Sequence, residues 1–484
     1  MSATKSDTPA LGGFDIRLVT ALLLAAVIVG LLLGDPGTRS GALLATLALA
    51  GVGVVALLLW KAEWSVPLML VAASFDLGGR IISEPMPLTA YQAVLLIGLA
   101  SWALRLLGGD ESARPRFTLI DAGLLLLLGA ALWSLPFSLD KGDTVMAIAR
   151  LVFIYLFCQL TSTFLRKQWV VDASMAGFVG AGVLQALIAL AQVLGASIGN
   201  TAVRVAGPTS PLRGSAFFED PNYLAAMLAA AVVVAAIKVV HARSLRQAIP
   251  WLAAAGVSAL GVYVTYSRTG LLALAVGLVV VWALAPSGRK RWVFLAGVLA
   301  AAGIVAANPE AVIGRFTTLT DVDSDQSAAT RYYMITSTLE IIRDHWAMGT
   351  GLGAFDMAYP AYRIAGSSFS VIRPHQLPLA MWAEMGIAGL VAEITITLAV
   401  LRTAWTSIRA QGSSAIPNGM VDLLAEAGDR LTLGQKAGLA IIASYAVGSL
   451  FQYFLYIEYL WFGVALLAGS TIARAALSSE VQDV

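Results

Sequence analysis

The chain has 484 residues, of which 58% are apolar and 12% are charged, and its formal net charge is +2. Apolar runs repeatedly reach the roughly 18 to 20 residues that cross a bilayer, which excludes a soluble globular protein. Runs such as Ala21 to Leu33 and Ala122 to Leu132 lack the two-residue alternation of a membrane β-barrel. The single cysteine, Cys158, excludes an intramolecular disulfide. The sequence therefore predicts an all-α polytopic membrane protein.

The apolar runs predict 12–14 transmembrane helices. The run at 65–79 is the weakest, because Asp76 and Arg80 close it after few residues, and we expect a short or re-entrant segment there. In chain order the candidate spans are 18–34, 41–60, 65–79, 88–107, 118–138, 144–163, 169–198, 222–240, 249–266, 269–286, 292–307, 377–401, 435–456 and 459–475.

The distribution of lysine and arginine predicts the orientation, because cytoplasmic connections are enriched in these residues. With a cytoplasmic N-terminus, the basic residues fall in alternate connections. These are Lys61; Arg105, Arg114 and Arg116; Arg166 and Lys167; Lys238, Arg243 and Arg246; Arg289, Lys290 and Arg291; and Arg402, Arg409, Arg430 and Lys436. We therefore expect both termini in the cytoplasm and the long loop 308–376 on the outer side.

Four regions follow from this reading. Residues 1–198 form a transmembrane scaffold, 199–307 are spans with arginine-bearing outer loops, 308–376 is one large outer loop, and 377–484 are the C-terminal spans. Asp121 and Arg150 are charges within spans, where we expect structural pairing because an unpaired charge is costly in the membrane. No internal repeat is apparent, which disfavours a transporter built from two related halves.

Arg213 and Arg268 lie in outer connections that enter helices. After Arg213, Asp220 or Asn222 can cap a helix and Pro221 suits its first turn, so that the positive helix end and the arginine together favour an anion. Pairing of Arg213 with Glu219 or a lipid headgroup is the alternative. Arg268 lies in the short turn Tyr266 to Gly270, where snorkelling to headgroups is the alternative role.

The loop 308–376 is too long for a simple connector. Apolar spacing over Thr330 to His345 predicts an amphipathic helix, and the glycine run Gly349 to Gly353 predicts a tight bend after it. Together they would form a lid. Its aromatic residues suit either stacking on sugar rings or anchoring at the interface, and they are Phe355, Tyr359, Tyr362 and Phe369.

His375 follows Arg373 directly before the span that contains Glu384. An imidazole at the membrane boundary can accept a proton near neutral pH or donate to a phosphate. The sequence has no HExxH or CxxC motif and no P-loop, so we expect no metal, no cofactor and no direct use of ATP.

The order of these motifs resembles the O-antigen ligase and polymerase family of bacterial envelope glycosyltransferases. The resemblance covers about residues 200–400. It rests on the arginine loop with its Pro-Asn helix start, the Ser-Arg-Thr-Gly turn, Arg331, the segment Gly349 to Phe355, and His375 followed by Glu384, Gly386 and Gly389.

The resemblance implies a GT-C-like enzyme of the bacterial inner membrane. Its donor would be an undecaprenyl-diphosphate-linked glycan on the periplasmic face, and transfer would invert the anomeric centre without a metal. Arg213 and Arg268 would bind the diphosphate and His375 would be catalytic. Glu219, Asp220 and Glu384 are reserve bases, and Arg331 and Arg373 would contact acidic sugars or lipid phosphates. Family members often have His-Asn where this chain has His375-Gln376, which leaves the role of the amide open.

Three functions remain open at this stage. The large aromatic and basic loop favours a polysaccharide polymerase, because it could hold a second lipid-linked glycan. An O-antigen ligase would instead transfer the glycan to a lipid A core, and a transporter would capture lipid-linked glycans without cleaving a bond. The expected partners are the glycan donor, a lipid-linked or lipid A core acceptor, membrane lipids and a chain-length regulator, with no nucleic acid.

Overall fold

A computed structural model of the protein describes residues 51–75, 80–82, 88–199, 203–204, 212–289, 326–364, 374–409, 428 and 430–482. The predicted spans 18–34 and 292–307, and the predicted site residue Arg373, lie outside the described residues. Within the described part, the strands form two short antiparallel pairs. These are β1 (Arg80–Ile82) with β2 (Leu88–Thr89), and β3 (Val203–Arg204) with β4 (Leu212–Arg213).

Eight helices of the described residues are long and apolar enough to cross a membrane. They are α4 (Ala90–Leu107), α5 (Leu119–Ser134), α6 (Lys141–Phe164), α7 (Gln168–Val193), α8 (Pro221–His241), α9 (Leu245–Val264), α15 (Leu377–Arg409) and α18 (Glu458–Gln482). The shorter helices of the bundle are Gly51–Trp60, α3 (Ser65–Ala73), α10 (Arg268–Ala283) and α17 (Leu433–Ser449). The predicted all-α polytopic membrane fold is confirmed, and the weak run at 65–79 is the short helix α3.

Side-chain oxygens fix where several of these helices begin. Thr89, Thr118 and Thr432 each form a capping box with the residue three positions later, and Asp220 and Ser267 cap α8 and α10. Each cap satisfies backbone N–H groups that have no partner within the first turn of the helix. The predicted start of α8 is confirmed with Pro221 in its first turn, and of the two cap candidates, Asp220 and Asn222, it is Asp220 that caps the helix.

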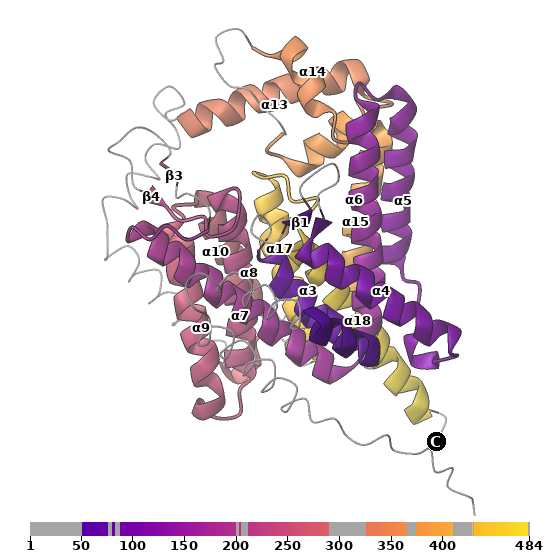
Figure 1. Cartoon of the computed structure of the whole chain (residues 1–484), viewed down its shortest axis with the longest axis vertical. Coiled ribbons are helices and arrows are strands. Elements are labelled where there is room, and N and C mark those ends of the chain that lie inside the picture. Colours follow the sequence, from indigo (N-terminus) through magenta and orange to yellow (C-terminus); the bar gives the residue numbers. More distant parts are fainter. Residues whose placement is uncertain are drawn as a thin grey trace, which may run out of the picture.

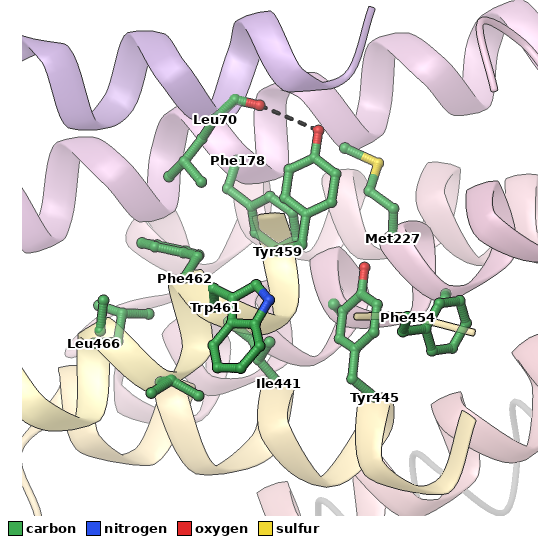
Figure 2. Close-up of a cluster of buried hydrophobic side chains, with 14 of the residues drawn as sticks. Leu70, Phe178, Met227, Ile441, Tyr445, Phe454, Tyr459, Trp461, Phe462 and Leu466 are labelled. Carbon is green, nitrogen blue, oxygen red and sulfur yellow. Dashed lines mark hydrogen bonds between the residues drawn. The ribbon is translucent and has the colours of Figure 1, made fainter. Parts of the chain in front are cut away.

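The helix α8 is the most deeply buried span and packs against α7, α9, α10 and α17. Small residues permit this close approach: a Cβ added to Gly270 on α10 would lie 2.4 Å from the Cβ of Ala225 on α8. A second part of the core joins α7, α17 and α18 through large rings. Tyr459 contacts Phe178, and its hydroxyl donates to the carbonyl of Leu70 at 3.3 Å (Figure 2).

A cluster of ion pairs lies at one end of the helix bundle, and α13 and α14 lie at the other. At one end, Glu63 accepts from Arg105 and Lys167 at 2.8 and 2.7 Å, which joins the end of α4 to the loop before α7. At the opposite end, α8 and α10 begin, and α13 (Gln326–His345) and α14 (Phe355–Tyr362) lie over the bundle (Figure 1). The helix predicted over Thr330 to His345 is therefore confirmed as α13.

Candidate functional site

Asn222 joins the two arginine-bearing turns. Arg213 donates from Nε to the carbonyl of Thr265 at 2.6 Å and from Nη2 to Oδ1 of Asn222 at 3.1 Å. The same Oδ1 accepts from the Ser267 hydroxyl at 2.7 Å, and Ser267 caps the helix whose first residue is Arg268. The start of α8 and the start of α10 are thereby held side by side, each with an arginine.

The backbone of both turns is strained. Among the described residues, two that are not glycine have a positive φ: Ala216 at 49° and Tyr266 at 50°. Ala216 lies three residues after Arg213, and Tyr266 lies two residues before Arg268. Backbone strain of this kind tends to occur at functional sites, where the surrounding structure enforces it.

The predicted acidic residues near α8 differ in their surroundings. Asp220 is half-buried and its Oδ1 accepts from the backbone N–H of Asn222 at 2.7 Å, whereas Glu219 is exposed. The contacts that orient Arg213 toward Thr265 and Asn222 therefore come from neutral groups.

His375 lies two residues before α15 and is half-buried. Burial lowers its pKa below the ordinary value, and the neighbouring Arg331 lowers it further, whereas the Asp220 carboxylate and the Gln452 side chain oppose this shift. The ring is therefore mainly neutral near pH 7, the form that can accept a proton. His375 lies near the start of α8, close enough for the Asp220 carboxylate to act on its pKa.

A narrow groove runs between α13 and the segment that precedes α15. Its lining includes Arg331, Thr338, Pro374, His375, Leu379 and Phe451. The guanidinium of Arg331 lies 5.7 Å from the ring centre of Phe451. His375 and Arg331 thus share one opening, with a largely apolar wall.

The loop between α17 and α18, residues 450–457, is the part of the site that the sequence did not predict. The apolar run 435–456 predicted one continuous span, but α17 ends at Ser449. Tyr453 donates through its hydroxyl to Oε2 of Glu384 at 3.1 Å, and its carbonyl accepts from the Tyr223 hydroxyl at 3.4 Å. Gln452, a buried amide within an aromatic stretch, is the one sequence signal that distinguishes this loop from a span.

The glycine run clamps a break in α15 and does not form part of a lid. The N–H groups of Thr350 and Gly351 donate to the carbonyls of Ala383 and Glu384, both at 2.9 Å. Gly386, at the break, has φ 63°, and a Cβ there would lie 2.2 Å from the carbonyl oxygen of Ala347. Only glycine fits this crossing of two backbones.

Glu384, a predicted reserve base, is 1% exposed and lies behind the loop 450–457, bound by Tyr453. For two of the lid aromatics, burial contradicts the prediction that they stack on sugar rings. Phe355 and Tyr359 are buried and stack on each other at 5.9 Å, within a cluster that includes Ile341, so neither ring is available to a sugar.

The two charged residues expected to pair within the membrane, Asp121 and Arg150, interact with neutral groups. Asp121 is buried and accepts from neutral groups, the amide of Gln159 and the N–H and hydroxyl of Thr118. Arg150 is exposed and lies 5.8 Å from the ring centre of Tyr456. Asp121 and Arg150 therefore do not pair with each other.

These observations define a polytopic integral membrane protein in which the segments of Arg213, Arg268 and His375 lie at one end of the helix bundle. The model of the O-antigen ligase family matches residues 253–394, which supports the resemblance of this region to the O-antigen ligase and polymerase family. The match includes Arg268, Arg331 and His375, whereas Arg213 lies outside it. The match indicates a glycosyl-transferring enzyme of this general type. No curated protein matches the chain in sequence.

Proposed function

We propose that the protein transfers a glycan from a polyprenyl diphosphate, such as undecaprenyl diphosphate, to an acceptor hydroxyl at the periplasmic face of the inner membrane. The observation that supports this most strongly is the arrangement around Asn222. It holds the turns of Arg213 and Arg268 together, beside the carboxylate of Asp220 that faces His375. Two arginine-bearing turns and one imidazole then lie at the same end of the bundle.

In this reaction the acceptor oxygen attacks the anomeric carbon as the bond to the diphosphate breaks. The acceptor proton passes to His375, and the lipid diphosphate leaves with the bonding electrons. Arg213 and Arg268 stabilise the negative charge that develops on the leaving group, a task suited to bidentate guanidinium groups. Because a single displacement occurs from the face opposite the leaving group, the anomeric configuration inverts.

The acceptor is the second part of the proposal. Aromatic residues of the outer loop favour a polymerase only if their rings are free to hold a second glycan, and Phe355 and Tyr359 are buried. The matched family carries the description O-antigen ligase, which makes a lipid A core the first acceptor to test. A second lipid-linked repeat, the acceptor of a polymerase, is the alternative.

The test uses purified protein with a lipid-linked oligosaccharide, with and without lipid A core, in the presence of a chelator. We expect a glycan on the core if the enzyme is a ligase and longer lipid-linked chains if it is a polymerase. Arg213→Ala and Arg268→Ala should weaken donor binding. Absence of any transfer, together with measurable movement of the lipid-linked glycan across a bilayer, would refute the enzyme and favour a transporter.

A further inference from the structure

Arg150 is a cation in a membrane-spanning helix that the proposed donor site does not use. It lies nine residues after the start of α6, about 13 Å along the helix axis at 1.5 Å per residue. The ion pairs between described residues do not include Arg150, and none of their hydrogen bonds does either. Its guanidinium lies over the face of Tyr456, 5.8 Å from the ring centre.

An arginine at this depth is costly in the membrane unless it faces a polar cavity or a charged partner. The contact with Tyr456 places Arg150 against the loop 450–457. This loop lies within the bundle, and four successive residues of it are buried. These residues are Gln452, Tyr453, Phe454 and Leu455. Arg150 therefore lies against the loop 450–457 at the exposed side of α6, and no carboxylate of the described residues forms an ion pair with it.

The loop 450–457 separates two groups of cations. On one side, α17 packs against α8 and α10, which carry the turns of Arg213 and Arg268. On the other side, α18 packs against α6, which carries Arg150. In Figure 1, α8 and α10 lie to one side of α17 and α6 lies to the other. Arg150 thus faces the same loop from the side opposite the proposed donor arginines.

We propose that Arg150 binds a phosphate or diphosphate group carried by the glycan acceptor. The inference rests on the proposed function, because it takes Arg213 and Arg268 as the ligands of the donor diphosphate. A second anion on the far side of the loop requires its own cation, and a guanidinium supported by an aromatic face provides one. The acceptor is either a second polyprenyl-diphosphate-linked glycan or a phosphorylated glycolipid core, and the two share this chemistry.

A binding measurement tests the site without catalysis. Protein in nanodiscs of zwitterionic lipid is titrated with radiolabelled geranylgeranyl diphosphate, so that no anionic headgroup competes. We expect wild-type protein to bind two molecules per chain, and Arg150→Gln and Arg213→Ala each to bind one. Arg114→Gln, an exposed arginine at the other end of the bundle, is the matched control and should bind two. An Arg150→Gln protein that binds two would overturn the proposal.

Steady-state kinetics then assign the site to the acceptor. In Arg150→Gln, the KM for an anionic acceptor should rise roughly 10- to 100-fold, with the donor KM unchanged. Arg150→Lys, which keeps the charge, should recover part of this loss. Paired assays with a lipid-diphosphate acceptor and a phosphorylated core acceptor identify the source, because only the true acceptor shows the rise.

The outcomes separate this inference from the proposed function. No transfer by the wild-type protein to either acceptor would overturn the proposed function. Intact transfer with an unchanged acceptor KM in Arg150→Gln would overturn this inference alone. A rise in the donor KM instead would place Arg150 in the donor site and would also overturn it. Unchanged thermal unfolding of Arg150→Gln shows that its effect is local.

Discussion

Substitution of Asn222 provides the sharpest test of how the site is assembled. Its Oδ1 accepts from the guanidinium of Arg213 at 3.1 Å and from the Ser267 hydroxyl at 2.7 Å. Asn222→Ala removes both hydrogen bonds and leaves the Asp220 cap of α8 in place. Asn222→Asp keeps the shape of the side chain but places a carboxylate against Arg213, which would then form an ion pair in place of binding the donor.

The expected magnitudes follow from the kinds of bond that are lost. A hydrogen bond to a charged group contributes about 1.5–3 kcal/mol and a neutral one about 1 kcal/mol. In Asn222→Ala, loss of the orientation of Arg213 should weaken donor binding by roughly 10- to 150-fold, and the free energy of unfolding should fall by about 1–3 kcal/mol. In Asn222→Asp, donor binding should fall at least as much while stability is retained.

Donor affinity is measured by titration with a lipid-linked glycan, and stability by thermal unfolding in detergent. Gln168→Ala is the matched control, because it removes an exposed amide near the other end of the bundle and should change neither quantity. Wild-type donor affinity in Asn222→Asp would refute the reasoning, since it would mean that the charge of Arg213 is not used. Equal losses of stability in both variants would show that Asn222 has only a structural role.

Three further predictions concern the break in α15, the base and the buried carboxyl. Gly386→Ala should lower the free energy of unfolding by at least about 3 kcal/mol, measured by thermal or denaturant unfolding. The lowered pKa of His375 places the acid limb of kcat/KM below pH 6.5, because transfer requires the neutral ring. Asp220→Asn should shift this limb to lower pH, since it removes a carboxylate that raises the pKa of His375, and Arg331→Gln should shift it to higher pH. Glu384→Gln should retain transfer activity, because this buried group accepts a hydrogen bond from Tyr453 and does not face the groove.

Each of these predictions has an outcome that contradicts it. Gly256→Ala is the control for Gly386→Ala, because a Cβ added at Gly256 on α9 would meet nothing within 4 Å. Equal stability of the two variants would contradict the clamp at the break in α15. Shifts of the acid limb in the same direction for Asp220→Asn and Arg331→Gln would show that the limb does not report on His375. Loss of transfer in Glu384→Gln with normal stability would show that this carboxyl takes part in the reaction.

The course of the helices could be predicted from the sequence because lipid imposes a simple rule on length and polarity. The runs at 118–138 and 222–240 correspond to α5 and α8 within a few residues, and Pro221 marked the start of α8 correctly, with Asp220 as one of two cap candidates. The span predicted from the run at 435–456 was wrong at its C-terminal end. The aromatic loop after Ser449 is as apolar as a span, and hydropathy does not distinguish the two.

The site could be predicted only as far as charge and local chemistry allow. Arg213, Arg268 and His375 stood out as polar groups at span ends, and the structure brings their segments to one end of the bundle. The role of the glycine run was mistaken, because its partner is a break in α15 more than 30 residues away, and such a contact leaves no mark on local spacing. The contact between Arg150 and Tyr456 depends on tertiary packing in the same way.

The most direct measurement of the central claim is single-turnover transfer by protein already loaded with a lipid-linked glycan, compared between wild type and His375→Ala. The account predicts that donor affinity stays within about threefold, because the arginines remain, while the transfer rate falls by roughly 10²- to 10⁴-fold through loss of the base. A His375→Ala protein that transfers the glycan at the wild-type rate would contradict it.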